Sequence, residues 1–350
     1  GHTVRTVDGS SDLTFVYDAA ARLTTVKETA GAGRTLKLFT YGTANGAGGD
    51  RRLGKLRTAA RTQYFSVCGK PHTAQIEETY FYFDPQGRTS KRDTKLSFDS
   101  IVGESFTQSF TWDSLGLPDL VTYPDCTAPL SCGASSPRTV DFNYQQGRLD
   151  AVVGYASSIG YHDNGAVNLV THANGVVDTQ LRDSNWMPRP RQIKSDLGAT
   201  PLWDSGTYSF DGSGNVTKTG AGAFRYDKVS RLVQGDAQLT AAGGSYSAQT
   251  YSFDAFGNIQ SIGGAGARST STNSATNRLG GASYDAAGNV IAEGGAVYEY
   301  DPFHQMRRFQ SGTEEWLYFY TADDQRIWSY QLGGSDRNRW TLRGLDGLVL

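Results

Sequence analysis

One short pattern returns along almost the whole chain and constrains its fold more than any other feature. The pattern is an aromatic residue, Asp, two variable residues, Gly, then Asn or Arg, and an aliphatic residue. Its clearest copies begin at Tyr284, Phe253, Phe210 and Phe83. Seven degenerate copies bring the number of candidate units to eleven, and they begin at Tyr17, Trp112, Tyr144, Tyr161, Tyr226, Tyr300 and Tyr320.

Each position of this unit has a role in a tight turn between two strands. Asp opens a type I turn by accepting a hydrogen bond from the backbone two residues further on, and Gly takes the positive φ that closes such a turn. The flanking residues then form paired antiparallel strands. The residues assigned to these turns are Tyr17, Asp18, Phe83, Asp84, Gly87, Trp112, Asp113, Gly116, Phe210, Asp211, Gly214, Tyr226, Asp227, Phe253, Asp254, Gly257, Tyr284, Asp285, Gly288, Tyr300 and Asp301.

A second large apolar residue precedes most units by two positions. Because side chains alternate in a strand, this spacing puts both rings on one face of a sheet. We therefore expect such pairs to share a face, to be mostly buried and to contact the pairs of adjoining hairpins. The pairs are Phe15/Tyr17, Phe110/Trp112, Tyr208/Phe210, Phe224/Tyr226, Tyr251/Phe253 and Tyr298/Tyr300.

Some units depart from the pattern at the glycine. Ala21, Ser230, His304 and Asp324 stand in its place, and the unit at Tyr144 is one residue short. At these positions the turn must differ or hold a residue in a strained conformation.

Composition agrees with an all-β chain. The 350 residues include 42 Gly, 19 Tyr and 16 Phe but only two Met, which favours turns and strands over helices. The units are unevenly spaced, which argues against a solenoid with a rigid rung. We predict hairpins of unequal length joined edge to edge, as a single segment over residues 1–350. Because the chain starts without Met and ends on an apolar run, we expect a fragment of a larger protein.

These units resemble the YD-repeat, or Rhs-repeat, family, which includes bacterial Rhs polymorphic toxins, the C components of insecticidal Tc toxins, and teneurins. The resemblance runs from Tyr17 to Tyr320, and eight of the units keep the Asp. It implies a long curved, coiled antiparallel sheet that forms part of a hollow shell around a C-terminal toxin or other cargo. The family's self-cleaving core has an Asp-Pro-x-Gly-Leu-like motif. The stretch 343–348 has Gly347 directly after Asp346 and lacks the Pro, so neither a cleavage site nor a toxin is assigned.

The leading hypothesis from this resemblance is a non-enzymatic structural segment of a secreted or surface-delivered bacterial protein, exported by a specialised system. Its partners would be other segments of the same protein and the enclosed cargo, with no cofactor and no metal. The alternative is a teneurin-like adhesion or carbohydrate-binding module with a glycan or cell-surface partner, in which exposed aromatic rings carry recognition. Burial of the six Trp side chains separates the two. A third hypothesis is a hydrolase in the irregular stretch from Cys126 to Trp203, for which no catalytic set can be named.

Charge and hydropathy exclude two kinds of partner. The chain has a formal net charge of -2, so no general basic field attracts nucleic acid or an anionic membrane. It also lacks the stretch of about eighteen apolar residues that a membrane span requires.

Three motif-like stretches are better explained as turns. Residues 49–55 match phosphate-loop spacing, but Leu56 offers no hydroxyl for magnesium. Residues 211–215 alternate oxygen side chains as calcium loops do, but Val216 occupies the place of the sharp-turn glycine. Cys68 and His72 could supply two zinc ligands, but two more would have to come from distant segments.

The three cysteines allow two interpretations. Cys126 and Cys132 lie close enough in a Pro/Ser-rich loop to form a disulfide, which leaves Cys68 free. The alternative is three reduced, buried thiols.

Overall fold

The structure is a computed structural model that describes residues 4–9, 11–29, 33–99, 101–126, 138–238, 246–264, 266–333 and 338–349. Its regular structure is almost entirely β strand, and the one helical element in these residues is a 3-10 turn, η1 (Ala47–Gly49). The prediction of an all-β chain is confirmed. No helix in the described ranges has the length and apolarity needed to cross a membrane.

The chain divides into two compact units. The first combines Gly1–Val140 with Ala282–Leu350, and the second is Asp141–Gly281. Within each unit, neighbouring strands pair antiparallel in the order of the chain, as expected of hairpins joined edge to edge. The single repeat segment over residues 1–350 stays a prediction.

The first unit contains an N-terminal and a C-terminal run of strands. The N-terminal run is β1 (Arg5–Val7), β2 (Asp12–Tyr17), β3 (Leu23–Glu28), β4 (Thr35–Tyr41), β5 (Leu56–Val67), β6 (Lys70–Phe81), β7 (Lys91–Phe98), β8 (Ile101–Trp112) and β9 (Pro118–Cys126). The C-terminal run is β26 (Ala282–Tyr284), β27 (Val290–Glu293), β28 (Ala296–Tyr300), β29 (Met306–Ser311), β30 (Glu314–Tyr320), β31 (Arg326–Leu332) and β32 (Asn338–Trp340). In β6 every second residue from Ala74 to Tyr80 is buried, because successive side chains of a strand point to opposite faces.

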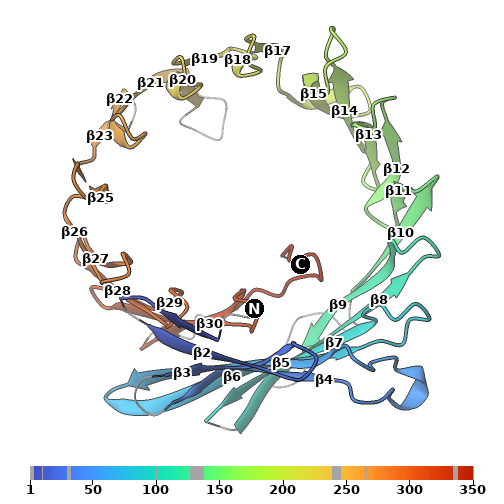
Figure 1. Cartoon of the computed structure of the whole chain (residues 1–350). Helices are drawn as coiled ribbons and strands as arrows, with labels where there is room; N and C mark the ends of the chain where they lie inside the picture. The colour runs from blue at the N-terminus through green and yellow to red at the C-terminus, as the bar shows by residue number, and fades with distance from the viewer. Residues whose placement is uncertain are drawn as a thin grey trace. The chain divides into compact units, whose positions relative to one another are not determined.

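These two runs pack face to face through an apolar cluster. Its buried members are Ala74, Ile76 and Leu96 from the N-terminal run and Leu317, Phe319, Ile327 and Trp328 from the C-terminal run. Figure 1 shows β30 lying against β5 and β6, although these strands are far apart in the sequence. The first unit is therefore a two-layer sandwich whose halves come from opposite ends of the chain.

The second unit is a succession of hairpins. Its strands are β10 (Thr139–Gln145), β11 (Arg148–Val152), β12 (Ala156–Tyr161), β13 (Val167–His172), β14 (Val176–Arg182), β15 (Pro190–Leu197), β16 (Thr200–Asp204), β17 (Tyr208–Phe210), β18 (Val216–Thr219), β19 (Gly222–Tyr226), β20 (Leu232–Gln238), β21 (Tyr246–Phe253), β22 (Ile259–Gly264), β23 (Arg268–Ser269), β24 (Thr272–Asn273) and β25 (Arg278–Leu279). Most of its described side chains are half-buried or exposed. The apolar core clusters found in the described residues belong to the first unit.

The aromatic pairs are mostly shielded from solvent, as predicted, but only one of their rings is fully buried. Among the six pairs only Phe110 is buried, at 6% exposure, and the other rings are half-buried. A shared face is confirmed where rings meet, since Tyr208 and Phe210 stack with centroids 6.2 Å apart. Their surroundings differ: Phe15 packs against a buried apolar cluster of the first unit, whereas Phe253 is covered by the guanidinium of Arg231.

Candidate functional site: the repeat turns and a buried ion network

The turn at Asp254 shows what the repeat unit builds. Phe253 is the last residue of β21, and the backbone N–H of Asp254 donates to the carbonyl of Asn258 (3.0 Å). The N–H of Gly257 donates back to the carbonyl of Asp254 (3.2 Å), and Gly257 has φ 93°. The strand register shifts by one residue beside the turn. This geometry is a type I turn closed by a bulge with a left-handed residue, as the sequence predicts.

The Asp carboxylate lies inside the turn and bonds to it repeatedly. Asp254 Oδ1 accepts from the N–H groups of Phe256 (2.9 Å) and Asn258 (2.9 Å). The same pair of bonds, to the second and fourth residues after the Asp, forms at Asp18, Asp84, Asp113, Asp211, Asp227 and Asp301. The Asp is thus the acceptor that satisfies backbone donors left open by the turn.

The residue after the glycine has a role that the sequence analysis missed. Its side chain reaches back to the same carboxylate: Asn258 Nδ2 donates to Asp254 Oδ2 (2.7 Å), and Arg22 Nε donates to Asp18 Oδ2 (2.8 Å). Asn215, Asn289, Arg88 and Arg231 do the same in their own units. The preference for Asn or Arg after the glycine indicates this role, since both side chains carry N–H donors and are long enough to contact the Asp carboxylate.

The same Asn also bonds to the next turn. Asn215 Nδ2 donates to Ser230 Oγ (3.1 Å), and Asn258 Nδ2 donates to Asn277 Oδ1 (2.5 Å). Where an Arg takes this place, its guanidinium lies over the first ring of the following unit. Arg88 is 5.4 Å from the ring centroid of Trp112, and Arg231 is 4.9 Å from that of Phe253. Consecutive turns are therefore linked by the residue after the glycine, and these arginines shield the half-buried rings.

The non-glycine residues at the closing position are in the strained conformation that the sequence allowed. Ala21, Ser230, His304 and Asp324 have φ between 59° and 64°. Three of them use their side chains in contacts that glycine could not make. Ser230 Oγ accepts a hydrogen bond from Asn215 Nδ2. His304 Nδ1 lies 3.0 Å from Asn289 Nδ2. Asp324 pairs with the cations that are described below. These long-range contacts offset the cost of a left-handed residue.

Two further turns have the same geometry but do not match the repeat pattern in the sequence. Asp183 opens one that is closed by Trp186 (φ 63°), and Arg189 Nε donates to the Asp183 carboxylate (3.0 Å). Gly344 and Gly347 make the backbone bonds of another. Neither turn has an aromatic residue directly before its first position, so neither matches the repeat pattern. The short unit at Tyr144 forms a different, two-residue turn at Gln146 and Gly147, both with positive φ.

Substituting Gly257 by Val should lower the free energy of unfolding by more than about 1 kcal/mol, because a β-branched residue resists φ near 93°. Gly212 is the matched control, since it lies in the same kind of turn with open space around its Cα and no positive φ. Denaturant unfolding of both Val variants measures the difference. Equal losses would contradict the turn's dependence on a left-handed residue.

Acid should weaken the turns. The bonds from Asn258 lower the pKa of Asp254 below its ordinary value of 3.8, and those from Asn215 do the same for Asp211. A carboxylate with a lowered pKa stabilises the fold above its unfolded pKa, and this stabilisation is lost as pH falls through the folded pKa. Unfolding free energy should therefore fall as the pH drops below about 5. The Asp254→Asn variant should show a shallower fall, whereas Asp163→Asn, at a 96% exposed side chain, should not.

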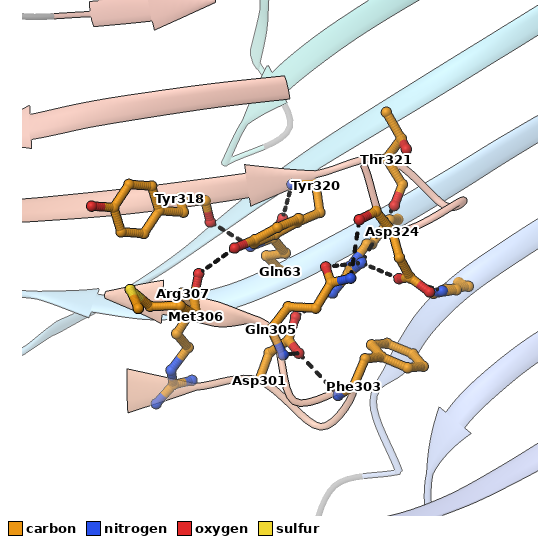
Figure 2. A network of polar contacts seen from close by, with 12 residues as sticks. Gln63, Asp301, Phe303, Gln305, Met306, Arg307, Tyr318, Tyr320, Thr321 and Asp324 are labelled. Carbon is orange, nitrogen blue, oxygen red and sulfur yellow. Dashed lines mark hydrogen bonds and ion pairs between the residues drawn. The ribbon is translucent and has the colours of Figure 1, made fainter. Parts of the chain in front are cut away.

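The predicted turn residue Asp301 also takes part in contacts inside the sandwich. Its carboxylate pairs with Arg61 of β5, whose side chain is 1% exposed. Arg61 also pairs with Asp324, and Asp324 Oδ1 accepts from Lys37 Nζ (2.6 Å). Figure 2 shows these turns of the C-terminal run converging on the network, with Phe303 beside it. The Arg61 guanidinium lies 4.8 Å from the Phe303 ring centroid. Two cations and two carboxylates from opposite ends of the chain thus share one site.

Hydrogen bonds extend this network along the sandwich. Gln63 Nε2 donates to the carbonyl of Tyr318 (2.9 Å), and the N–H of Tyr320 donates to Gln63 Oε1 (2.6 Å). Tyr320 Oη donates to the carbonyl of Met306 (2.6 Å), and burial raises the pKa of Tyr320 to about 12. Burial also lowers the pKa of Lys37 despite the nearby Asp324. Hydrogen bonds and ion pairs depend on direction. The buried polar side chains of this network therefore keep their partners only when the two runs pack in this one alignment.

A second polar contact joins the two runs near β32. Arg92 of β7 pairs with Glu78 of β6 (3.4 Å), and burial raises the pKa of Glu78. Arg92 Nη2 and Gln108 Nε2 both donate to the carbonyl of Arg343, the latter at 3.0 Å. The residues after β32 are therefore held against β7 and β8.

In the proposed hydrolase region, His172, Asp178 and Ser195 form a polar cluster whose order does not fit nucleophilic catalysis. Ser195 Oγ donates to Asp178 Oδ1 (2.5 Å), and His172 Nε2 lies 2.8 Å from Asp178 Oδ2. The serine therefore bonds to the carboxylate, whereas activation of a serine requires a bond to the imidazole.

The other motif-like stretches are turns or paired side chains. Lys55 Nζ donates to the carbonyl of Gly87 and is not turned toward a phosphate site. Cys68 is exposed, has φ 49° and is a free thiol, and His72 Nδ1 lies 2.8 Å from Asp99 Oδ2. The interpretation with three buried thiols is thus wrong for Cys68. Cys132 and the Cys126 side chain lie outside the described residues, so their disulfide stays a prediction. No group of three or more ligating side chains suited to a metal occurs in the described ranges.

The tryptophans divide between the two units. Trp328 is 8% exposed and stacks on Trp340, with centroids 5.2 Å apart, in the first unit. Trp186 and Trp203, in the second unit, are 68% and 53% exposed. The stacked tryptophans of the first unit therefore fit a packing role, whereas Trp186 and Trp203 of the second unit remain available for recognition.

Comparison with known proteins shows a likeness of structure. No protein-family model matches the sequence, and no curated protein matches it. The crystal structure of TcdB2-TccC3-TEV matches with a TM-score of 0.68 and 13% identity, over 98% of this chain and 21% of that one. TcdB2-TccC3 matches with 0.67 and 14%, over 97% and 21%. The Photorhabdus luminescens Tc holotoxin pore matches with 0.65 and 14%, over 95% and 20%.

The chain thus spans about a fifth of the length of the solved chains that it matches. The likeness covers both runs of the first unit and the hairpins of the second, because nearly the whole chain aligns. Together with the repeat turns, it confirms the predicted fold. This chain has the YD-repeat β-shell fold seen in the TcdB2-TccC3 chains.

Proposed function

We propose that this chain is a structural wall segment of a larger, secreted or surface-delivered Rhs-type protein, and that the wall encloses or presents a toxin or other cargo. The observation that carries the proposal is the match to TcdB2-TccC3 over 97% of the chain. One similar structure is TcdB2-TccC3 without its hypervariable C-terminal region. By analogy, the cargo of this protein would follow the repeat segment.

The described contacts support a wall. Turns that contain the Asp bond to its carboxylate, and Asn215 and Asn258 also bond to the next turn. Hairpins of the second unit are thus linked although its described residues form no apolar core cluster. The sandwich of the first unit joins residues from both ends of the chain. These features suit a sheet whose task is containment.

Limited proteolysis of the full-length protein tests containment. The segment that follows this chain should stay uncut at protease concentrations that digest the same segment expressed alone. Mass spectrometry of the fragments identifies the cuts. Equal rates of cleavage in both forms would contradict enclosure, while leaving the β fold of the chain unaffected.

A second function, adhesion through exposed rings, is favoured by one observation. Trp186 and Trp203 are both more than half exposed, and exposed Trp rings are common in recognition surfaces. Binding to a glycan array or to cells should then fall in the Trp186→Ala and Trp203→Ala variants. Phe256→Ala is the control, since Phe256 is 72% exposed in the same unit. Absence of binding by the unmodified chain would remove this function.

We further infer that the isolated chain catalyses no turnover. The clearest polar cluster of the second unit places Asp178 between the serine and the histidine, and its pKa is lowered by bonds from Ser195 and His172. Hydrolysis of a peptide, glycan or nucleotide substrate that disappears in the Asp178→Asn variant would contradict this inference.

A further inference from the structure

A cavity lies at one end of the sandwich in the first unit. It has a volume of about 520 Å³, within the roughly 300–1,000 Å³ range of small-molecule sites. It opens where Arg34, just before β4, and Arg307 of β29 approach the β5–β6 hairpin. Its remaining lining is Tyr64, Phe65, Ser66, Gly69, Pro71, His72, Thr73 and Asp99.

The two arginines are positioned by the same residue. The Arg34 guanidinium lies 4.9 Å from the ring centroid of Tyr64, and Arg307 Nη1 donates to the Tyr64 carbonyl (3.2 Å). Tyr64 Oη in turn donates to the carbonyl of Thr35 (3.2 Å), so the ring under Arg34 is itself held. Such prior ordering lowers the cost of binding a ligand.

These arginines have donors to spare. In the described part of the chain, no carboxylate forms an ion pair with Arg34, and its charge meets only the Tyr64 ring. Arg307 pairs with Glu299 (3.1 Å), but its buried Nε has no acceptor among the described atoms. Figure 2 shows the Arg307 side chain pointing away from the buried ion network. A guanidinium with free N–H groups favours a carboxylate as its ligand.

The charge balance of the cavity also favours an anion. Its charged lining is Arg34, Arg307, His72 and Asp99. Asp99 is already committed, because it binds His72 Nδ1 (2.8 Å) and accepts from the N–H of Thr73 (2.8 Å). A smaller adjoining cavity adds Glu28, Arg61 and Asp301, of which the last two pair with each other. Arg307 shares its charge with Glu299, so Arg34 is the arginine of this lining that no described carboxylate pairs with.

The rest of the lining is suited to a polar ring. His72 stacks on Phe65 with ring centroids 5.8 Å apart, and Pro71 adds an apolar surface beside them. Ser66 and Thr73 supply hydroxyls. Apolar surface together with hydroxyl groups suits a ligand ring that carries hydroxyls of its own.

From these features the structure assigns a binding site for a sugar acid, with the ligand carboxylate held by Arg34 and Arg307 and its hydroxyls held by Ser66 and Thr73. This activity is separate from containment, since it requires no cargo. Such a ligand has two sources, a free sugar acid or the terminal residue of a glycan.

Calorimetric titration of the whole chain with D-glucuronate tests the assignment, with D-glucose and acetate as comparison ligands. Glucuronate should bind, and Arg34→Gln should weaken its binding by about tenfold or more, as for loss of one charge-assisted contact. Arg34 is exposed, so its substitution leaves the fold intact. The control is Arg148→Gln, which removes an arginine that lies 5.5 Å from the Tyr161 ring centroid in the second unit and should leave binding unchanged.

A methyl glucuronide distinguishes the sources. If it binds as well as glucuronate, the site accepts glycan termini, and if it fails while glucuronate binds, the site accepts the free acid; both results support the site. No binding of either compound at millimolar concentration would overturn it. So would glucose or acetate binding as tightly as glucuronate, or an Arg34→Gln variant that binds like the unmodified chain.

Discussion

Replacing Arg61 by Ala should lower the free energy of unfolding by about 3–5 kcal/mol, the usual result of removing one partner from a buried ion pair. The side chain is 1% exposed, and the Asp301 carboxylate that it leaves behind is 8% exposed. Asp301 would then be a buried charge without its cation, and Asp324 would retain only Lys37. Urea unfolding followed by circular dichroism measures the loss.

An exposed ion pair is the matched control. Arg5 and Asp12 are 2.6 Å apart, but the Arg5 side chain is 56% exposed, so Arg5→Ala should change stability far less. Adding Asp301→Asn to Arg61→Ala should recover part of the loss, because a neutral amide costs less to bury than an unpaired carboxylate. Similar losses in Arg61→Ala and Arg5→Ala would show that the network does not hold the two runs together.

Replacing Phe319 by Ala should also cost about 3–5 kcal/mol, since the ring is 2% exposed and its removal leaves a cavity. Phe319 stacks on Trp328 with centroids 4.5 Å apart and meets Phe65 of β5 edge-on at 5.5 Å. It thus joins the C-terminal run to the N-terminal run through apolar contact alone. Thermal and denaturant unfolding of the variant give the change.

Phe256 is the control for this change. It is 72% exposed at the tip of a repeat turn, so Phe256→Ala should alter stability by no more than about 0.5 kcal/mol. Phe253, which is half-buried and covered by Arg231, should fall between the two. A loss at Phe256 as large as that at Phe319 would contradict the assignment of the core to the sandwich.

For the aromatic pairs, the sequence predicts which rings share a face but not what covers that face. Their spacing of two predicts a shared face, and the stacked rings of Tyr208 and Phe210 agree with this. Whether that face is buried depends on what lies over it, which strand periodicity does not encode. At Phe253 the cover is the guanidinium of Arg231, which belongs to the preceding unit. This cover by a guanidinium of the preceding repeat differs from the ring-to-ring contact between adjoining hairpins that the spacing predicts.

The buried network could not be found from the sequence. Asp301 was recognised as a turn residue, and it has that role, with bonds from the N–H groups of Phe303 and Gln305. Its second role requires Arg61, which lies 240 residues earlier. No periodicity links two residues so far apart, because their contact depends on how two complete runs of strands pack.

The sequence by itself determined most of the local structure: the hairpins, the turns that match the repeat pattern, and the left-handed residue that closes them. These follow from short-range effects, since an Asp acceptor, a residue tolerant of positive φ and a strand-forming ring act within about six positions along the chain. Tertiary structure alone decided that the first and last segments form one sandwich and that Arg61, Asp301, Asp324 and Lys37 meet inside it. The reason is that burial and charge pairing between distant strands depend on the packing of whole sheets, which is a property of the folded chain and not of any one stretch of it.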